Sequence, residues 1–307
     1  MKKVFVVGSI TTDLLFKADI LEKKEEKGRW SLAHGGKYLV DKFKILHGGG
    51  GANAAVSLAK QGLDVWLMGR LGNDIFGKMA RANLKKHHIK NTALKFMKNP
   101  SAVSAVIVDK SGDKTIFNYR SAADDFHISP KELKLLKKVN WLALFSCPKW
   151  EKEEKTAFLK KAHLLKKHVF LSLHGSEYKK GINYLKPYFK YTSILHLNAY
   201  ELADLLGKNI SEVNFYKENV SQILNIPLVL ISHDSKGAYA HTVREIYYQT
   251  AIKPSRILDS TGAGDAFASG FLGHFAKTGD IRKALYFGAK NGSSVIKHYG
   301  AQVGLLK

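Results

Sequence analysis

The chain contains a single cysteine, Cys147, and no long hydrophobic run among its 307 residues. One cysteine cannot form a disulfide bond within the chain, and this scarcity is typical of proteins of the reducing cytosol. The first apolar run, residues 4–7, ends at Gly8 and is too short for a membrane span or a signal-peptide core. We therefore expect a cytoplasmic protein without a membrane partner, in which Cys147 is a small buried apolar residue.

Arginine is also scarce, although the chain is strongly basic. Only seven of the 49 lysine and arginine residues are arginine, and the formal net charge is +23. A basic surface binds any polyanion by releasing counterions, so nucleic-acid binding is one interpretation of this charge. The lysines, however, are spread over many helical segments, and arginine reads bases and phosphates better than lysine does. We favour a lysine-coated surface whose positive field attracts anionic ligands, and we expect no nucleic-acid partner.

Short apolar runs alternate with amphipathic stretches along most of the chain. The apolar runs predict strands at residues 4–7, 65–68, 142–145, 169–173, 194–197 and 228–231. The amphipathic stretches predict helices at residues 52–60, 76–87, 151–165 and 199–206. This alternation predicts an α/β fold, a three-layer α/β/α sandwich with a mostly parallel central sheet. We expect one domain over residues 1–307, because motifs near both ends must form a single site.

Two segments break this alternation. Residues 16–47 have no long helical pattern, and residues 102–120 have the pattern of a hairpin with a turn at residues 110–113. Together they predict a small separate β-sheet. A sheet without a core of its own has to cover another surface, so we expect a lid over the cleft of the main domain. The lid is also the surface through which we expect a homodimer.

A glycine-rich turn precedes a predicted helix near the C-terminus. Phenylalanines recur every fourth residue after this turn, and its sequence is Asp259-Ser260-Thr261-Gly262-Ala263-Gly264-Asp265. Main-chain amides at such a helix N-terminus point toward one spot, where the helix dipole favours an anion such as a transferring phosphoryl group. Asp265 could be a general base for a substrate hydroxyl, or only a favourable partner of the dipole, and the spacing leaves both open.

A second glycine-rich segment lies near the N-terminus, where four consecutive glycines, residues 48–51, are followed by Ala52 and Asn53. Glycines let the backbone approach a ligand closely, and the Asn53 amide offers a donor and an acceptor to sugar hydroxyls. A glycine run alone is more often a flexible turn. The chain contains no G-x-x-x-x-G-K-[ST] phosphate loop and no G-x-S-x-G elbow, which argues against the enzymes that use those motifs.

With these two segments the chain resembles the ribokinase-like (PfkB) family of carbohydrate and nucleoside kinases. The C-terminal turn is similar to the family signature D-T-x-G-A-G-D, and residues 47–55 are similar to its N-terminal signature. The resemblance spans nearly the whole chain. It implies an anion hole formed by the backbone of Gly262, Ala263 and Gly264, with Asp265 as the catalytic base.

The resemblance also implies the residues that bind the substrate. They are Gly49, Gly50 and Asn53 of the N-terminal signature, and Asp13, whose carboxylate grips substrate hydroxyls beyond the first strand. An aspartate in a loop is otherwise most often a turn former. Ribokinases commonly carry a lysine where Gly50 stands, so this departure leaves ribose open as the substrate.

Two cation sites follow from the same resemblance. Asn198 and Glu201 are similar to the N-x-x-E motif that orders Mg²⁺ and its waters, although the same pair fits a helix capping box. The family also implies a monovalent cation, such as K⁺, near Asp259. Residues 69–77 resemble the stretch G-x-x-G-x-D-x-x-G, in which Asn73 or Asp74 would cap a helix.

The nucleotide side of the site is implied by residues of the C-terminal half. Residues 230–238 resemble the stretch T-L-G-x-x-G-A, in which Ser232 keeps a hydroxyl, Asp234 replaces a glycine and Gly237 is retained. Thr261 of the glycine-rich turn and Asn291 complete the expected ATP site.

These expectations describe an ATP- and Mg²⁺-dependent kinase that phosphorylates a hydroxyl of a small sugar. A nucleoside is the second choice and would need an aromatic clamp from Trp30, Tyr38 or Phe117. A sugar phosphate is the third choice, since Arg120 and Lys114 could bind its phosphate. With another substrate, Arg120 either binds that substrate or is a solvated charge of the lid. An alternative of another class is a non-catalytic polyanion-binding protein on a kinase fold, which the net charge favours and Asp265 disfavours.

Overall fold

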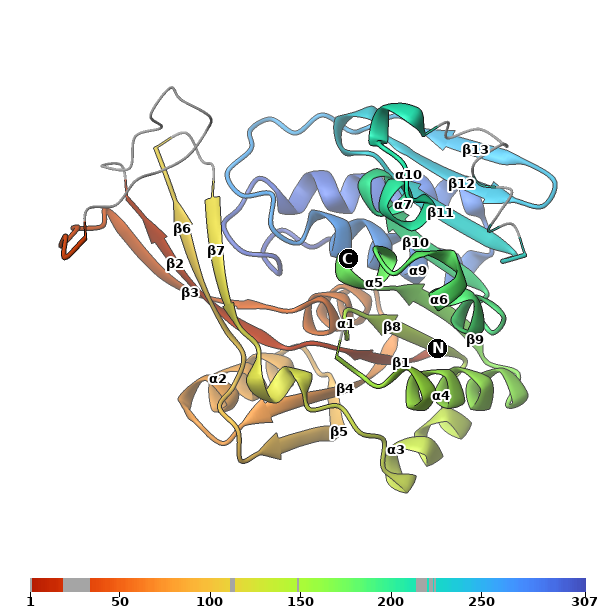
Figure 1. Cartoon of the computed structure of the whole chain (residues 1–307), viewed down its shortest axis with the longest axis horizontal. Coiled ribbons are helices and arrows are strands. Elements are labelled where there is room, and N and C mark those ends of the chain that lie inside the picture. The colour runs from red at the N-terminus through yellow and green to blue at the C-terminus, as the bar shows by residue number, and fades with distance from the viewer. Residues whose placement is uncertain are drawn as a thin grey trace.

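The computed structural model describes residues 2–18, 34–110, 114–147, 149–213, 220, 223 and 225–307. In these ranges the chain forms a nine-stranded sheet between helices and a separate four-stranded sheet (Figure 1). The larger sheet has the spatial order β13 (Ile246–Gln249), β12 (Ala238–Thr242), β11 (Leu228–Ser232), β10 (Ile194–Asn198), β9 (His168–Ser172), β8 (Trp141–Phe145), β1 (Lys3–Gly8), β4 (Asp64–Gly72), β5 (Lys90–Met97). Neighbouring strands from β11 to β5 are parallel, and β12 and β13 add an antiparallel hairpin at one edge. The predicted mostly parallel sheet is confirmed.

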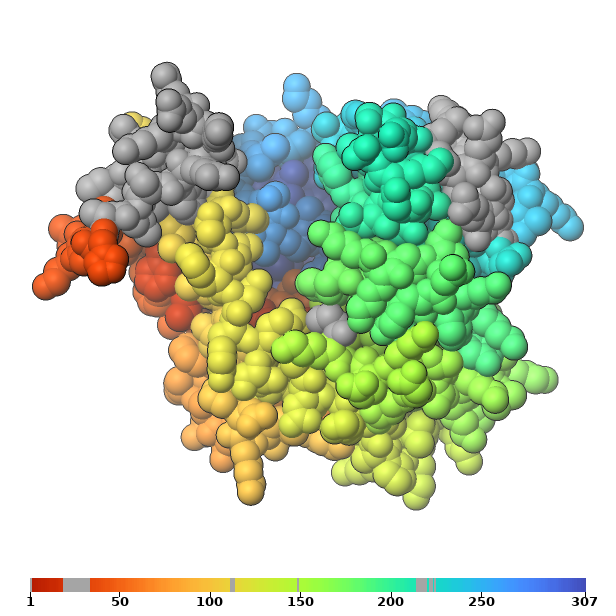
Figure 2. Space-filling model, viewed as in Figure 1, coloured from red at the N-terminus to blue at the C-terminus, as the bar shows by residue number. Residues whose placement is uncertain are grey.

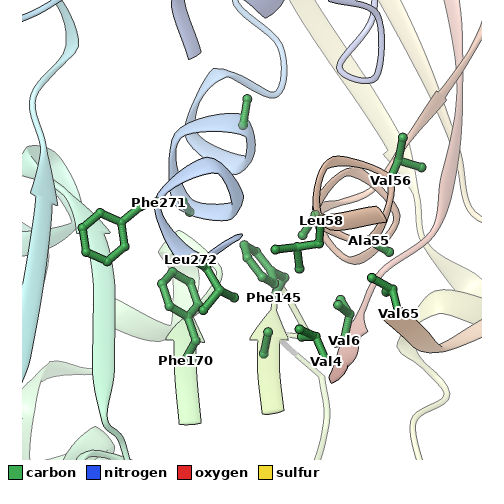
Figure 3. Close-up of a cluster of buried hydrophobic side chains, with 14 of the residues drawn as sticks. Val4, Val6, Ala55, Val56, Leu58, Val65, Phe145, Phe170, Phe271 and Leu272 are labelled. Atoms are coloured by element: carbon green, nitrogen blue, oxygen red, sulfur yellow. The ribbon is translucent and has the colours of Figure 1, made fainter. Parts of the chain in front are cut away.

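Two hydrophobic cores lie on opposite faces of the nine-stranded sheet, because alternate residues of each strand point to opposite sides. Val4 and Val6 belong to one core, and Phe5 and Val7 belong to the other. The first core is covered by α1 (Gly50–Lys60), α2 (Ile75–Lys86), α9 (Ala263–Thr278) and α10 (Ile281–Val295), and Figure 3 shows part of it. The second is covered by α3 (Pro130–Leu135), α4 (Lys152–Leu164), α5 (Gly175–Tyr178), α6 (Gly181–Phe189) and α7 (Ala199–Leu206). None of the helices within the described ranges is both long enough and apolar enough to cross a bilayer.

The four-stranded sheet, called the lid sheet below, projects from one side of the main body (Figure 1). Its spatial order is β3 (Lys42–Gly48), β2 (Thr11–Lys17), β6 (Val103–Val108), β7 (Lys114–Tyr119). The predicted hairpin is confirmed, because β6 pairs with β7 in antiparallel register. The lid sheet begins earlier than predicted, at Thr11, so Asp13 lies inside β2 and not in a loop. Trp30 and most of the predicted turn at 110–113 lie outside the described residues.

Strand register gives the lid sheet two faces of different character. The inner face carries Thr11, Asp13, Leu15, Lys17, Lys42, Lys44, Leu46, Ser104, Val106, Val108, Lys114, Ile116 and Asn118. Its apolar residues pack with Tyr299 of the main body, so this face is turned toward the body. The outer face carries Leu14, Phe16, Phe43, Ile45, Ile107, Phe117 and Tyr119. In the space-filling view, C-terminal residues (blue) lie at the bottom of a hollow between the lid sheet (yellow) and the green part of the body (Figure 2).

Residues 69–77, where turns were predicted, form the end of β4, a link at residues 73–74 and the start of α2, and Asp74 is the N-cap of α2. Its Oδ1 accepts hydrogen bonds from the Gly77 amide at 2.8 Å and the Ser101 hydroxyl at 2.7 Å, and its Oδ2 accepts from the Ser101 amide at 2.7 Å. A Cβ on Gly77 would lie 2.0 Å from the Gly72 carbonyl oxygen, so the turn needs glycine there. Although burial opposes ionisation, the hydrogen bonds from Ser101 and Gly77 lower the pKa of Asp74.

We predict that Asp74→Ala lowers the free energy of unfolding by about 2–4 kcal/mol, because it removes a helix cap and leaves the Ser101 amide without an acceptor. Asp74→Asn is the matched control, since it keeps the cap and loses only the hydrogen bond from the Ser101 amide, and it should cost about half as much. Denaturant unfolding at pH 7 measures both. The stabilisation by Asp74 is present above the unfolded pKa and is lost as the pH falls toward the lowered folded pKa. An Asp74→Ala protein as stable as the wild type would contradict this role.

Candidate active site

The N-terminus of α9 is built to face an anion. Gly262 is the N-cap with φ 78°, and a Cβ there would lie 2.3 Å from the Ala301 Cβ, so only glycine fits. The first i→i−4 hydrogen bond of α9 runs from the Ala266 amide to the Gly262 carbonyl. The amides of Gly264 and Asp265 therefore have no acceptor within the helix. A Cβ on Gly264 would meet open space, so an anion can reach these amides.

Asp265 and Asn53 join two motifs that are 212 residues apart in the sequence. Asn53 Nδ2 donates to Asp265 Oδ2 at 2.8 Å, and Gln302 Nε2 donates to Asn53 Oδ1 at 3.2 Å. Burial raises the pKa of Asp265, and the hydrogen bond from Asn53 partly opposes this effect. The other oxygen, Oδ1, lies beside Gly50, where a Cβ would stand 3.4 Å away. One carboxylate oxygen is therefore held in place, and the other faces the first residue of α1.

The glycine run lies where α1 begins, next to Asp265. Gly49 is the N-cap of α1 with φ 91°, and a Cβ there would lie 2.5 Å from the Ser9 carbonyl oxygen. Ser146 follows β8 with φ 34°, a strained value for a serine. A Cβ added to Gly50 would lie 3.4 Å from the Ser146 Cβ, so the two residues are neighbours. Sequence reasoning missed Ser146, because nothing in its neighbours demands a positive φ there.

Asp13 approaches this region from the inner face of the lid sheet. It is buried, its Oδ1 accepts from Thr11 Oγ1 at 3.3 Å, and a Cβ on Gly48 would lie 2.3 Å from its Oδ2. Burial raises the pKa of Asp13, and hydrogen bonds from Ser104 and Thr11 lower it. The negative charge of Asp259 adds to the rise in the pKa of Asp13.

Asn198 and Glu201 form the predicted capping box at the N-terminus of α7. The Glu201 amide donates to Asn198 Oδ1 at 2.8 Å, and the Asn198 amide donates to Glu201 Oε2 at 2.8 Å. Burial raises the pKa of Glu201 to about 7, with a further contribution from the negative charge of Asp265. Glu201 Oε1 points toward Gly175, where a Cβ would lie 3.7 Å away. The cap therefore uses Oε2 of the Glu201 carboxylate and not Oε1.

Ser232 lies at the end of β11, on the predicted nucleotide side. Its Oγ is 3.3 Å from His196 Nε2, and His196 Nδ1 is 3.0 Å from Ser172 Oγ. Burial lowers the pKa of His196 to about 4, so its imidazole is neutral at pH 7. A neutral imidazole donates through one nitrogen and accepts through the other, and it thereby links the ends of β9 and β11. Sequence reasoning also missed His196, since a lone histidine inside a strand resembles any core residue.

Asp234 and Gly237 shape the turn between β11 and β12. Asp234 has φ 43°, a left-handed conformation that glycine adopts most easily and that aspartate tolerates. This explains how aspartate can replace the expected glycine without changing the turn. Gly237 has φ 100°, and a Cβ there would lie 2.2 Å from the Gln249 carbonyl oxygen. Their contact with a nucleotide stays a prediction.

Asn291 is completely buried in α10. Its Nδ2 donates to Ser57 Oγ at 3.2 Å and to the Ala266 carbonyl at 2.7 Å, and its Oδ1 accepts from the Leu306 amide at 2.9 Å. These bonds connect α10 to α1, to α9 and to the C-terminal segment. The side chain is thus used within the fold, and its predicted contact with ATP has no support from these bonds.

Lys114 and Arg120, the predicted phosphate-binding pair, lie at opposite ends of β7. Lys114 Nζ donates to Asp259 Oδ1 at 3.0 Å, whereas Arg120 Nε donates to Asp124 Oδ1 at 3.0 Å. Six residues of extended strand separate them by about 20 Å, too far to share one phosphate. Arg120 keeps one terminal nitrogen, Nη2, that is buried without a hydrogen-bond partner in the described part of the chain.

We predict that Glu201→Gln stabilises the ligand-free protein above pH 7. Glutamine keeps the cap, because its side-chain oxygen can accept from the Asn198 amide. The pKa of Glu201 in the folded protein is raised from 4.5 to about 7. The protonated side chain therefore makes its full contribution to stability below the pKa of the unfolded chain, and this contribution is lost as the pH rises to about 7. At pH 8 the variant should gain about 1–3 kcal/mol, and at pH 4.5 it should match the wild type.

Thermal unfolding at several pH values measures this difference. Glu212→Gln is the matched control, because Glu212 Oε2 accepts from the Asn209 amide at 3.0 Å in a similar cap on the surface. The control should show no stabilisation at pH 8. A Glu201→Gln protein that melts at or below the wild-type temperature at pH 8 would show that burial does not penalise the Glu201 carboxylate.

Comparisons with known proteins agree with this geometry. The chain matches the pfkB family carbohydrate kinases over residues 1–307. It is 25% identical over 312 aligned residues to the ribokinase of Bacillus subtilis, covering 99% of this chain and 96% of that protein. It is 24% identical over 268 aligned residues to a 5-dehydro-2-deoxygluconokinase of Clostridium botulinum, covering 83% of this chain and 79% of the relative.

Solved structures share the fold at lower identity. The ribokinase of Arabidopsis thaliana, solved with ribose and ATP, superposes with a TM-score of 0.81 at 21% identity and covers 100% of this chain and 96% of its own. The nucleoside kinase of Burkholderia thailandensis, solved with inosine, superposes with a TM-score of 0.78 at 17% identity and covers 98% of this chain and 94% of its own. The match over its whole length shows that this chain belongs to the pfkB family of carbohydrate kinases, phosphotransferases that act on an alcohol group.

Proposed function

We propose that this protein transfers the γ-phosphate of ATP to a hydroxyl group of a small sugar. The observation that carries the proposal is the 2.8 Å hydrogen bond between Asn53 and Asp265, which joins the glycine–asparagine segment to the N-terminus of α9. A carboxylate with a raised pKa thereby lies beside main-chain amides that face open space. Phosphoryl transfer to an alcohol needs both a base and an anion cradle.

In the proposed reaction, Asp265 accepts the proton of the attacking hydroxyl, while Asn53 holds the other oxygen of its carboxylate. The backbone of Gly262, Ala263 and Gly264 forms the cradle for the oxygens of the γ-phosphoryl group; the Gly264 amide has no acceptor within the helix, whereas the Ala263 amide donates to the Ser260 carbonyl at 3.3 Å. The positive end of α9 stabilises the charge that grows on the phosphoryl oxygens. The proton would pass directly from the hydroxyl to the carboxylate, so the proposed reaction needs no relay residue.

The substrate would lie between the lid sheet and the start of α1. Asp13 binds its hydroxyl groups from the inner face of the lid sheet, and Gly49 and Gly50 let it approach the backbone of α1. Asn53 and the unpartnered Nη2 of Arg120 are further donors to the sugar. We propose that all of residues 1–307 form one kinase domain, in which the lid sheet closes over this space.

ATP is supported as the phosphate donor by two solved relatives, since one ribokinase was solved with ATP and a Cryptococcus neoformans ribokinase was solved with ADP. In this chain Ser232, Asp234, Gly237 and Thr261 are the residues proposed to surround the nucleotide, whereas the buried Asn291 holds α10 against α1 and α9. Of these, Ser232 has a hydroxyl whose position the neutral His196 fixes.

Mg²⁺ fits the residues near the proposed phosphates. The described residues contain no cluster of three or more histidine, cysteine, aspartate or glutamate side chains that could hold a metal by themselves. Mg²⁺ in phosphotransferases commonly keeps most of its waters and takes one or two carboxylates, so Glu201 and the nearby Asn198 suffice. Bound there, the ion would neutralise charge on the transferring phosphates. The charge of a bound cation would also return Glu201 to its ionised form.

A nucleoside is the second candidate substrate, and the lid sheet offers it little support. Phe117 shares a face with Phe43 and Ile45, opposite to Asp13, so it cannot clamp a base in the site of its own subunit. Tyr38 precedes β3, and its ring lies against Gly36. A sugar phosphate is disfavoured because Lys114 and Arg120 are each paired with a carboxylate and lie far apart.

The outer face of the lid sheet supports a homodimer. Phe43, Phe117 and Tyr119 are 50%, 62% and 55% exposed, although they are large apolar or aromatic residues on one side of a small sheet. Such a patch marks a surface that another molecule covers. We propose that a second copy of this chain covers it, because in a two-fold dimer the outer faces of the two identical lid sheets can pack against each other.

We predict that Asp265→Asn lowers turnover by about 10³-fold or more, because the amide cannot accept the hydroxyl proton. The variant should fold normally, since the oxygen of the new side-chain amide can still accept from Asn53. Coupled detection of ADP release, screened over ribose, fructose, adenosine, inosine and fructose 6-phosphate, measures turnover and identifies the substrate. Activity close to that of the wild type would refute the mechanism. Salt-dependent retention on DNA without turnover on any acceptor would favour the polyanion-binding alternative.

We also predict that Phe117→Asp shifts the protein from dimer to monomer, because a charge would be buried in the apolar interface. Val243→Asp is the matched control, since Val243 is 75% exposed in the turn between β12 and β13, remote from the lid sheet in sequence and fold. Sedimentation equilibrium measures the mass of each variant. A wild type that stays monomeric at tens of micromolar would rule out this interface.

A further inference from the structure

Lys114 reaches the catalytic turn from the lid sheet. It is the first residue of β7 and lies on the inner face opposite Val108. Its Nζ donates to Asp259 Oδ1 at 3.0 Å and to Thr261 Oγ1 at 2.5 Å. The Lys114 side chain is only 22% exposed, and that of Asp259 is 7% exposed, so the ion pair is largely shielded from water. Shielded pairs of this kind are less sensitive to salt than surface pairs.

The carboxylate of Asp259 already has donors on both oxygens. Besides Lys114, its Oδ1 accepts from the Thr261 amide at 2.9 Å and from the Thr261 hydroxyl at 2.5 Å. Its Oδ2 accepts from the Gly300 amide at 3.0 Å. Although burial opposes ionisation, the bonds from Thr261 and Gly300, together with the charge of Lys114, lower the pKa of Asp259. Asp259 is therefore an anion whose charge is balanced by one ammonium group.

These residues do not fit the free monovalent cation expected near Asp259. An ammonium group and K⁺ carry the same charge, are similar in size and bind the same oxygen atoms. The Lys114 ammonium already uses Asp259 Oδ1 and Thr261 Oγ1, two side-chain oxygens of the turn, and Asp259 Oδ2 accepts from the Gly300 amide. A second cation at these oxygens would stand next to the ammonium and be repelled by it.

We propose that Lys114 is a built-in cation that takes the place of a monovalent metal ion beside Asp259. It acts as a positioning residue, because the turn that it holds, residues 259–262, leads directly into the N-terminus of α9. A shift of this turn would move the amides that face the phosphoryl group, and small misplacements in such sites are costly. The cation replacement stands on the contacts of Lys114 alone, whereas its effect on turnover rests on the proposed kinase reaction.

Because Lys114 belongs to the lid sheet, the built-in cation also connects the lid sheet to the catalytic turn. Lys44 of the same inner face lies over the Tyr299 ring, with Nζ 4.9 Å from its centre, and a Cβ on Gly300 would touch Leu46 at 3.2 Å. The inner face therefore docks on residues 299–300, next to the Gly300 amide that binds Asp259. The Lys114 ammonium therefore balances the charge of Asp259 only while the lid sheet lies against the main body.

The wild-type protein gives the first test, which needs no variant. Its melting temperature and turnover are measured in KCl, NaCl and choline chloride at equal ionic strength. We expect equal melting temperatures and turnover within about twofold, since screening by the three salts is alike. Turnover that is severalfold higher in KCl than in choline chloride would overturn the proposal, because a free cation site would then be present. A melting temperature that is several degrees higher in KCl would do the same.

Lys114→Ala gives the second test, because it removes the ammonium and leaves its oxygen partners. In choline chloride it should melt at a lower temperature than the wild type and turn over about tenfold to hundredfold more slowly. KCl or ammonium chloride should restore part of both losses. Lys44→Ala is the matched control, since it removes a lysine of the same face that contacts Tyr299 and not Asp259, and its response to KCl should match that of the wild type.

The melting temperature is read without substrate, so this test does not depend on the kinase assignment. If Lys114→Ala melts at the same temperature in KCl and in choline chloride, the built-in cation is refuted even when the enzyme is active. If Lys114→Ala does not fold in either salt, Lys114→Gln replaces it, because glutamine keeps a donor and lacks the charge. A KCl-dependent gain in stability with no turnover on any acceptor would support the cation replacement and refute only the proposed kinase reaction.

Discussion

The hydrogen bond between Asn53 and Asp265 is the contact on which the site depends, since it fixes the N-termini of α1 and α9 against each other. So close an approach demands glycine where backbones meet. A Cβ on Gly51 would lie 2.5 Å from the backbone of Gly8, and a Cβ on Gly8 would lie 2.4 Å from the Phe145 carbonyl oxygen. The glycines near the N-terminus are therefore required by packing as much as by ligand approach, and they bring both helix dipoles to one place.

Negative charge is concentrated at this point in a chain whose net charge is +23. Burial raises the pKa of Asp13, Asp265 and Glu201, and Glu201 is raised further by its neighbour Asp265. Ionisation of each of these carboxylates therefore lowers the free energy of unfolding of the ligand-free protein. Such a site is stable only because two cores elsewhere hold the fold, which is the usual relation between stability and activity in enzymes. Asp259 escapes this cost because hydrogen bonds from Thr261 and Gly300, together with the charge of Lys114, lower its pKa.

Local patterns predicted what depends on neighbours in sequence. The start of α7 at Ala199, the turn before α9 and the hairpin of β6 and β7 follow from capping residues, glycines and alternation. The strand β5, the helix α10 and the hairpin of β12 and β13 were not predicted, because their mixed polar and apolar residues become half-buried only in the assembled sheet. Long-range contacts between side chains could not be predicted from local patterns either. Gln302 reaches Asn53 across 249 residues, and no local pattern marks a glutamine for that role.

Register decides which side chains of the lid sheet face the main body. Asp13, Ser104 and Asn118 line one face of three adjacent strands, and Phe16 and Phe117 lie on the other face. A slip of one residue would exchange the two faces, turning apolar rings toward the main body and the Asp13 carboxylate toward the outer face. The start of β2 at Thr11, two residues before Asp13, therefore decides which groups lie over the candidate site and which lie on the outer surface of the sheet.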